Sequence, residues 1–557
     1  MQSVQKFCKI GALFALVFLS LQCQNKENMA SADTIIHHVQ IWSDTLQDAD
    51  WIAIRDGKIE ALGKGDYHQF QGPETALLDG QGAFVTPGFI DAHVHFLMGG
   101  ANLLSVQLRD AGTRAEFIER IAGFAGSQKP GAWITGGDWN HELWGGALPE
   151  RSWIDSVTPD NPVFLNRLDG HMALANTKAL ELAGLLDAPL PVIDGGEVVI
   201  GPDGKPTGIF KDNAMGLIDQ YIQSNPEEVD RALDTACQYV LSNGVTMVHH
   251  MGTWDDYAVF RRNRDRGDLS VRIYSVTPLA AWERLRDTIA AHGTGDDHLW
   301  IGGLKGFVDG SLGSHTAAFF EPFSDKPDDT GLLVNSEADL EDWISHADQA
   351  GLHVIVHAIG DRANAILLDI YHRLDAKNGA RDRRFRIEHA QHLNDSLVQK
   401  IVSTGTIASM QPYHAIDDGC WAEKVIGPER IKMTYAFRSL LDAGAHVAFG
   451  SDWFVAPPDV LAGIYAAATR RTLDGQNPDG WVPEQKITVE QALRAYTSGG
   501  AYACKMEDRV GRLEPGYLAD LVVMDRNLLT IAPESIRETR IMRTMVDGKW
   551  EWIRTED

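Results

Sequence analysis

Two histidines separated by a single residue are the first feature of this sequence that could do chemistry. They are His93 and His95, at the end of Val85-Thr86-Pro87-Gly88-Phe89-Ile90-Asp91-Ala92-His93-Val94-His95. The apolar run before them, entered through a Pro-Gly pair, is typical of a short β-strand. Alternate side chains of a strand share a face, so the two imidazoles would lie about 6–7 Å apart on one side. Such a pair can ligate one metal ion, or it can be hydrogen-bonded at a strand end.

Further polar side chains occur at or near the ends of other predicted strands. Lys305 lies in Leu304–Val308, and the runs His353–His357 and Phe385–His389 each end in a histidine. Asp452 follows the run His446–Gly450. The carboxyl ends of barrel strands share one mouth, where the active sites of (β/α)₈ barrels lie, and zinc-type ions accept imidazole and carboxylate ligands. The candidate metal ligands are His93, His95, Lys305, His357, His389 and Asp452.

The elements that must position these residues alternate between strand and helix patterns, which indicates a parallel α/β fold. Eight runs fit one barrel: Phe89–His95, Thr246–His250, Arg272–Val276, Leu304–Val308, His353–His357, Phe385–His389, Ile407–Gln411 and His446–Gly450. Two more, Trp133–Asp138 and Pro162–Asn166, are left over. We therefore expect a barrel over residues 87–504, with an insertion at about residues 100–240 that covers its mouth.

Both ends of the chain carry short predicted strands joined by tight turns. Asp56-Gly57 and Asp547-Gly548 are hairpin signals, because these residues adopt positive φ at low cost. Residues 33–86 and 505–557 would each form a sheet too small to be stable alone. We expect the two segments to pack together as a composite β-sandwich.

The sequence resembles the amidohydrolase superfamily, through Pro87-Gly88-Phe89-Ile90-Asp91-Ala92-His93-Val94-His95 and the ligand set above. It resembles most closely the branch of the N-substituted formamide deformylases and YtcJ-like hydrolases. The residues behind this closer resemblance are Gly136-Gly137-Asp138-Trp139, Asp169-Gly170-His171, Asn176 to Leu180, Lys305 to Gly313, and His357-Ala358-Ile359-Gly360-Asp361. The resemblance extends from about Ile35 to the end of the predicted sandwich.

The resemblance implies a (β/α)₈ TIM barrel that hydrolyses non-peptide, amide-like carbon–nitrogen bonds of small molecules through a metal-activated hydroxide. It implies one or two divalent ions, expected to be Zn²⁺, with Lys305 carboxylated on Nζ as a bridge between them. Asp452 would also move protons as general acid and base. His171 would stabilise the oxyanion. The residues expected to contact the substrate are Trp139, Asp169, His171 and Asp309.

Several alternatives stay open. An uncarboxylated Lys305 has no lone pair for a metal and would pair with Asp309 or with a substrate carboxylate. The same site could hydrolyse esters, lactones or cyclic amides. Two alternatives belong to other classes of protein: a non-catalytic exported binding lipoprotein and a structural envelope protein. The intact ligand set disfavours the binding lipoprotein. Some aromatic and histidine side chains have ordinary structural interpretations: Trp144, Tyr413 and Trp453 as core residues or pocket walls, His249 and His250 as structural residues.

The net charge limits the partners that the protein can bind, and the cysteine content limits its disulfides. The 557-residue chain has a formal net charge of −27, which argues against binding nucleic acid or anionic membranes, because both require clustered Lys and Arg. The resemblance implies a small-molecule substrate as the partner, and the oligomeric state is left open. Cys237, Cys420 and Cys504 are too few and too scattered for a disulfide framework.

The N-terminus has the pattern of an export signal. Lys6 and Lys9 precede the apolar run Ile10–Leu21, which is too short to span a bilayer as a helix. Cys23 follows as in a bacterial lipoprotein signal, whose cysteine is acylated, although Gln22 stands where a small residue is expected. Ala30-Ser31-Ala32 is a competing cleavage site. Residues 1–32 are thus expected to be a signal, and the protein periplasmic or membrane-anchored through a lipid on Cys23.

Overall fold

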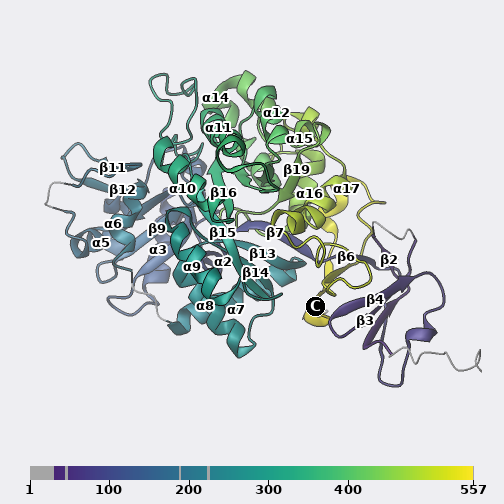
Figure 1. Ribbon diagram of the computed structural model, residues 1–557. Helices are drawn as coiled ribbons and strands as arrows, with labels where there is room; N and C mark the ends of the chain where they lie inside the picture. Colours follow the sequence, from purple (N-terminus) through teal and green to yellow (C-terminus); the bar gives the residue numbers. More distant parts are fainter. Residues whose placement is uncertain (1–30, 44–47, 187–189, 223–225, 556–557) are drawn as a thin grey trace, which may run out of the picture.

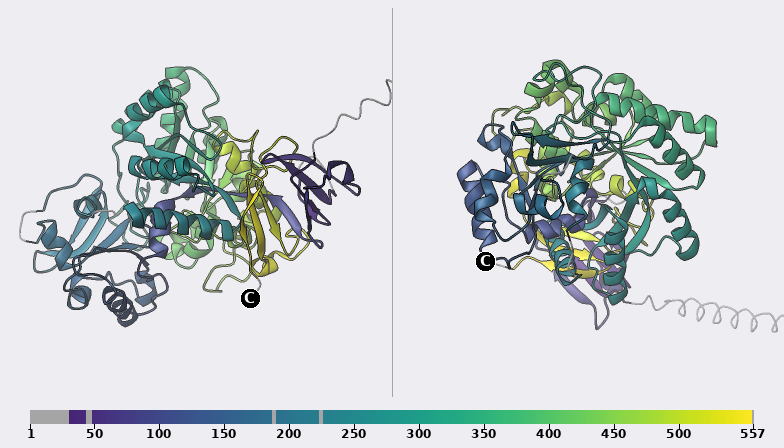
Figure 2. Two further views of the ribbon diagram at one scale, coloured as in Figure 1. Left: turned by 90° about the horizontal axis from the view of Figure 1, so that it is seen from below. Right: turned by 90° about the vertical axis from the view of Figure 1, so that its left-hand side faces the viewer.

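The computed structural model describes residues 31–43, 48–186, 190–222 and 226–555. Residues 1–30 of the predicted leader, with Cys23, lie outside these described residues. Figures 1 and 2 show three bodies in a row: a central barrel, an inserted domain on one side, and the sheets of the chain ends on the other. Within the described ranges no helix is long and apolar enough to cross a bilayer. The described cysteines, Cys237, Cys420 and Cys504, have free thiols.

Eight parallel strands form the central sheet, in the order β19-β18-β17-β16-β15-β14-β13-β7. They are β7 (Phe89–Val94), β13 (Val245–Met251), β14 (Arg272–Pro278), β15 (Leu299–Phe307), β16 (His353–Ala358), β17 (Arg386–His389), β18 (Ile407–Met410) and β19 (His446–Phe449). The bridge between Val94 and Trp453 brings the first and last strands together and nearly closes the barrel. At this seam Asp91 accepts hydrogen bonds from the backbone N–H of Ser451 at 2.8 Å and from its hydroxyl at 2.5 Å. The predicted TIM barrel is confirmed, and each of the eight predicted runs overlaps a barrel strand.

Helices cover the outside of this sheet, and the largest apolar core lies between the two. The helices are α2 (Phe96–Leu103), α7 (Pro226–Ser242), α8 (Trp254–Arg266), α9 (Trp282–His292), α10 (Glu337–Gln349), α11 (Asp361–Asn378), α12 (Asp395–Ser403), α13 (Pro412–Asp418), α14 (Ala422–Arg430), α15 (Phe437–Asp442), α16 (Val460–Thr469), α17 (Val489–Ala495) and α18 (Ser498–Ala503). Hydroxyl or amide side chains cap several of them, as Thr253 does for α8 and Asn394 for α12. Although α7 falls within the residues expected for the insertion, it packs against α2 and β13 of the barrel.

A second sheet lies between β7 and β13 in the sequence, in the order β11-β12-β10-β9-β8. Its strands are β8 (Ile134–Trp139), β9 (Val163–Arg167), β10 (Met172–Ala175), β11 (Gly196–Ile200) and β12 (Pro206–Asp212). The two left-over runs of the sequence correspond to β8 and β9. Two apolar clusters pack this sheet against its helices, α3 (Arg114–Ala125) in one, α5 (Thr177–Leu182) and α6 (Gly216–Asp219) in the other. We call this unit the inserted domain.

The two chain ends share the third body. One sheet is N-terminal only: β1 (Thr34–His37), β3 (Trp51–Arg55), β4 (Lys58–Gly63) and β5 (Ala76–Asp79). The other combines β2 (Gln40–Ile41) and β6 (Phe84–Pro87) with β20 (Leu521–Met524), β21 (Ile541–Val546) and β22 (Lys549–Ile553). Apolar side chains from both ends form one core. The fully buried Arg272 of β14 binds both carboxylate oxygens of Asp520, at 2.6 and 2.9 Å, and fixes this body to the barrel.

Candidate metal centre

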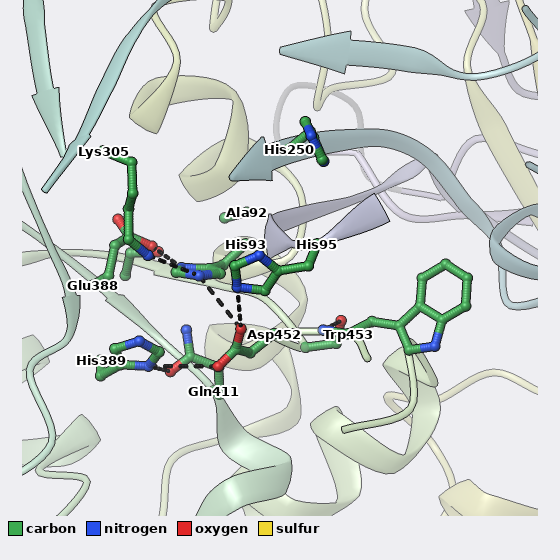
Figure 3. A network of polar contacts seen from close by, with 12 residues as sticks. Ala92, His93, His95, His250, Lys305, Glu388, His389, Gln411, Asp452 and Trp453 are labelled. Carbon is green, nitrogen blue, oxygen red and sulfur yellow. Dashed lines mark hydrogen bonds and ion pairs between the residues drawn. The ribbon is translucent and has the colours of Figure 1, made fainter. Parts of the chain in front are cut away.

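Side chains from β7, β17 and the loop after β19 converge at the barrel mouth (Figure 3). The Nε2 atoms of His93 and His95 each lie 3.4 Å from Asp452 Oδ1. Nδ1 of His389 lies 4.0 Å from Asp452 Oδ2. Potential ligand atoms of His93, His95 and Asp452 are all within 4.8 Å of one another. The structure therefore brings together the predicted ligands of the first, sixth and last barrel strands.

Asp452 provides the test of whether a cation fits here. It is 6% exposed, and its Oδ1 accepts no hydrogen bond from any residue in the described part of the chain. An unpartnered buried carboxylate oxygen is costly, and an ion shared with the neighbouring imidazoles would satisfy it. Burial opposes ionisation of Asp452, but His93, His95 and His389 hold its pKa well below the ordinary value. Burial lowers the pKa of His93 to about 4, so its imidazole is neutral at pH 7, the form that binds metal. The donors fit a zinc-type ion.

Backbone conformation at two of these positions is unusual. Asp452 has a φ of 60° and His389 a φ of 72°, both in the left-handed region that side chains other than glycine rarely adopt. Such strain persists only where the surrounding structure enforces it, and it is common at functional sites. The two predicted ligands thus adopt their backbone conformation at a conformational cost.

Glu388 orients His93 from below the mouth. Its Oε2 accepts the hydrogen of His93 Nδ1, which leaves His93 Nε2 to face Asp452. Arg386 donates to both carboxylate oxygens of Glu388, at 2.8 and 3.0 Å, and all three residues are fully buried. Burial opposes ionisation, yet Arg386 and His93 hold the pKa of Glu388 below its ordinary value. Carboxylates that accept from the second ring nitrogen of a ligand histidine fix its orientation. This pair was not predicted from the sequence, although Arg386 and Glu388 are two positions apart and so share one face of a predicted strand.

Lys305 lies beside the same histidine. Its Nζ is 3.3 Å from His93 Nε2 and 4.7 Å from the centre of the Phe307 ring. Burial lowers the pKa of Lys305 to about 8, which increases the fraction of neutral amine that reacts with carbon dioxide. Asp309, its alternative partner, instead accepts from the backbone N–H groups of Ala318, Ile359 and Gly360. Asp309 therefore ties two barrel loops together, and no ion pair joins it to Lys305 among the described residues.

His357 and His171 stand next to each other above the cluster. His357 Nε2 donates to Gly310 O at 3.0 Å, and its ring centre lies 4.6 Å from that of His389. His171 comes from the inserted domain, 5.3 Å from the His357 ring, and its Nδ1 donates to Asp212 Oδ1 at 2.7 Å. Burial opposes protonation of His171, but Asp212 and other carboxylates raise its pKa to about 9. His171 is therefore a protonated donor at neutral pH.

A cavity with about 660 Å³ of empty space, open to solvent, lies over these residues. Asp169 is on its wall, where it accepts from the hydroxyls of Ser311 and Ser314 and pairs with Arg167 at 2.7 Å. Burial opposes ionisation, but Arg167 and His171 lower the pKa of Asp169 to about 2. Its carboxylate is thus occupied by protein groups and anchors the turn that carries His171. The barrel, the inserted domain and the helices after β18 all contribute walls, including Arg167, His171, Ser311, His389, His414, Asp417, Trp421 and Asp452.

Most aromatic residues noted in the sequence lie elsewhere. Trp139 is fully buried in the inserted domain, and its Nε1 donates to Leu165 O at 2.7 Å. Trp144 packs against Phe117 and Trp153, whereas Trp453 packs against Phe96 and Tyr239. Trp421, which the sequence analysis did not single out, lines the cavity instead. Trp139 therefore packs in a core of the inserted domain. His249 contacts Arg386 at 2.9 Å inside the barrel.

A parallel eight-stranded barrel with imidazoles and a carboxylate at its mouth defines a metal-dependent hydrolase. The chain belongs to the amidohydrolase family, whose pattern matches residues 76–550. It is 37% identical to Protein LONG AFTER FAR-RED 3 of Arabidopsis thaliana, over 93% of this chain and 91% of that one. It is 30% identical to YtcJ of Bacillus subtilis, which is named as a putative amidohydrolase, over 89% and 95% of the two chains. The N-substituted formamide deformylase of Arthrobacter pascens is 27% identical, over 91% and 95%. These relatives confirm the predicted branch.

A solved structure shares the whole architecture. An uncharacterized metal-dependent hydrolase from Pyrococcus horikoshii superimposes with a TM-score of 0.73 at 26% sequence identity. The match covers 90% of this chain and 99% of that one. The matched part is therefore larger than the barrel alone.

Proposed function

We propose that this protein hydrolyses a carbon–nitrogen bond of a non-peptide, amide-like small molecule. One observation carries the proposal: Asp452 Oδ1, which accepts no hydrogen bond from the described residues, lies 3.4 Å from the Nε2 atoms of both His93 and His95, on a cavity that the protonated His171 also lines. An acceptor of protons and a donor to a carbonyl are the two groups that amide hydrolysis requires. The deformylase relative, named for its action on N-substituted formamides, supports the choice of bond.

The side chains at the mouth have different roles in this reaction. A divalent ion held by His93, His95, His389 and Asp452 would polarise the carbonyl and lower the pKa of a bound water. His171, kept protonated by Asp212, donates its Nε2 hydrogen to the carbonyl oxygen as negative charge develops there. Asp452 takes the proton of the attacking water and returns it to the leaving nitrogen, which must be protonated to depart. Asp169 and Arg167 hold the turn that presents His171.

The test is elemental analysis of the purified protein, followed by assays on N-formyl amides, other amides and matched esters. We expect one or two divalent ions per chain and turnover of at least one amide. Asp452→Asn should keep most of the metal and lose about 10²–10⁴-fold in amide turnover, because an amide side chain cannot carry the proton. A matched ester should lose less, since its leaving oxygen needs less protonation. Metal-loaded protein that turns over esters but none of the amides would contradict the choice of bond.

A further inference from the structure

A second cavity lies beside the one at the barrel mouth. It has about 950 Å³ of empty space, open to solvent, and its walls come from the inserted domain, the loop after β15 and the helix α14. Arg167, Gly313 and Trp421 line both cavities, so the two adjoin along these residues. A substrate whose carbonyl lies at Asp452 would therefore have room for a long substituent beyond Arg167.

The walls of the second cavity carry an excess of positive charge, although the whole chain has a formal charge of −27. Burial lowers the pKa of His141 to about 4 and also lowers the pKa of His315, so both of these wall histidines are neutral at pH 7. The excess of two cations favours an anionic occupant. The charged wall residues are the cations Arg167, Lys211, Lys326 and Lys424 and the acids Glu142 and Asp325.

Two of these lysines have no charged partner in the described part of the chain. Neither Lys326 nor Lys424 forms an ion pair or a side-chain hydrogen bond there, whereas Lys211 pairs with Glu197 at 2.8 Å. Lys326 lies in the loop after β15, and Lys424 lies on α14, so the two face the cavity from separate elements. Both are exposed, and a lysine ammonium on its flexible stem can move to contact an anion.

Arg167 adds a buried cation at the boundary between the two cavities. It is 3% exposed, its Nε donates to His141 Nδ1 at 3.3 Å, and its Nη1 lies 2.7 Å from Asp169 Oδ2. No hydrogen bond joins Nη2 to another residue of the described ranges, which leaves its N–H groups for a ligand. A Cβ at Gly313 would lie 2.9 Å from both Nη atoms, so glycine leaves the space that the guanidinium needs. Guanidinium N–H groups are well suited to carboxylates.

We propose that the second cavity is a subsite for an anionic substituent, and that the substrate is an amide-like small molecule with a carboxylate at a distance from the reacting bond. This substrate class rests on the hydrolytic function proposed above and adds a charge to it. Lys326 and Lys424 would contact the carboxylate in the second cavity. Arg167 would contact the part of the substrate that passes between the two cavities.

Matched probes test the charge of the substrate: ω-formamido carboxylates with carbon chains of increasing length, and the formamido alcohols of the same lengths. Each is tested on metal-loaded protein, as a substrate and as a competitive inhibitor of whichever amide the protein hydrolyses. At the best length, the carboxylate should bind or react at least about tenfold better than the alcohol, chiefly through KM or the inhibition constant. Salt at about 1 M should reduce this preference, because it screens exposed charges.

The double variant Lys326→Gln with Lys424→Gln should lose most of the preference, and Lys424→Glu should favour the alcohol. Lys129→Gln is the matched control, because Lys129 is an exposed lysine of the inserted domain that lines neither cavity. Thermal melting shows whether each variant is folded. If the double variant does not fold, the two single variants decide, each with an expected loss of about threefold.

Three results would contradict the proposal in different ways. Equal binding and turnover of carboxylates and alcohols, in a wild type that hydrolyses amides, would overturn the anionic subsite and leave the hydrolytic proposal intact. A preference for carboxylates that survives in the folded double variant would overturn the assignment of the second cavity. Metal-loaded protein that hydrolyses no amide would overturn the hydrolytic proposal itself, together with the substrate class that rests on it.

Discussion

Glu388 accepts a hydrogen from His93 Nδ1 at a depth where neither side chain is exposed to solvent. Arg386, also fully buried, balances the charge of the carboxylate. This arrangement fixes which nitrogen of His93 points to the mouth, and it does so from inside the barrel. The orientation of His93 at the mouth therefore depends on the buried ion pair between Arg386 and Glu388, which lies out of reach of a substrate.

Glu388→Gln should weaken metal binding about 10–100-fold, because the neutral amide holds His93 less firmly. It should also lower the melting temperature of the metal-free protein, since Arg386 is left as a buried charge without its partner. Glu341→Gln is the control. Its pair with Arg373 is 36% exposed at the glutamate, and exposed pairs contribute little. Unchanged metal affinity in a folded Glu388→Gln protein would show that His93 does not need this carboxylate.

The variant Lys305→Ala distinguishes two hypotheses, that Lys305 is carboxylated and that it is a cation. If Lys305 bridges metals as a carbamate, metal content should fall, and short carboxylic acids or bicarbonate should partly restore activity. Lys305→Arg should then fail as badly, because a guanidinium stays charged and repels the ions. If Lys305 only binds substrate as a cation, Arg should retain some activity with full metal content. Elemental analysis decides between them, and normal metal occupancy in Lys305→Ala would exclude the carbamate.

Asp138 should make the inserted domain sensitive to pH. Burial raises the pKa of Asp138 to about 7, although Arg109 and the hydrogen bond from Asn102 oppose the shift. The Asp138 carboxyl therefore binds its proton more tightly in the folded state than in the unfolded state. The stability that this protonation contributes is complete below about pH 4 and is lost as the pH rises toward 7. Asp138→Asn removes the titration. The free energy of unfolding of Asp138→Asn relative to wild type should rise across that range by at most about 4 kcal/mol and level off above it.

Denaturant unfolding at a series of pH values measures this difference. Asp110→Asn is a suitable control, because Asp110 is exposed on the same domain and pairs with Arg120. A stability difference between Asp138→Asn and wild type that does not change between pH 4 and 7 would contradict the assignment. Asp138 is also connected to the candidate metal centre. Arg109 lies 3.8 Å from Asp138 and donates to the carbonyls of Phe454 and Val455, just after Asp452.

We propose that export processing occurs before Ala32. Ala32 is 3% exposed, its amide donates to Phe70 O at 2.8 Å, and its carbonyl accepts from Thr75 at 2.6 Å. Cleavage after Ala32 would remove these contacts from the N-terminal sheet. Mass spectrometry of protein from the membrane fraction should therefore find Cys23, with an added lipid mass, as the first residue, and Cys23→Ser should abolish the lipid. A mature chain that begins at Asp33, or full-length chain in the cytoplasm, would contradict the proposal.

The barrel and the cluster of side chains at its mouth could be predicted because their signals are local. His93, His95 and Asp452 follow apolar runs, and strand alternation and barrel geometry bring such residues to one mouth. Glu388 and Arg386 were detectable in principle, since both lie on the inward face of a predicted strand. His414 had no such signal, because a helix after a strand does not reveal which of its residues face a cavity.

Two residues expected to contact the substrate have clear contacts within the protein. Trp139 and Asp309 occur in motifs typical of the family, yet one packs in a core and the other binds three backbone N–H groups. A motif shows that a residue type is required at a position. It does not distinguish contact with substrate from support of the loops that make the contact.

The seam of the barrel has a consequence for biosynthesis. Asp91 and Ser451, which meet there, are separated by 360 positions in the sequence. Asp452 follows Ser451, so its carboxylate leaves the ribosome long after His93 and His95. No nascent chain that stops short of β19 can present the complete centre, and ions captured earlier would meet only part of the donor set. The donor set at the mouth is therefore complete only in the compartment where the last strand docks.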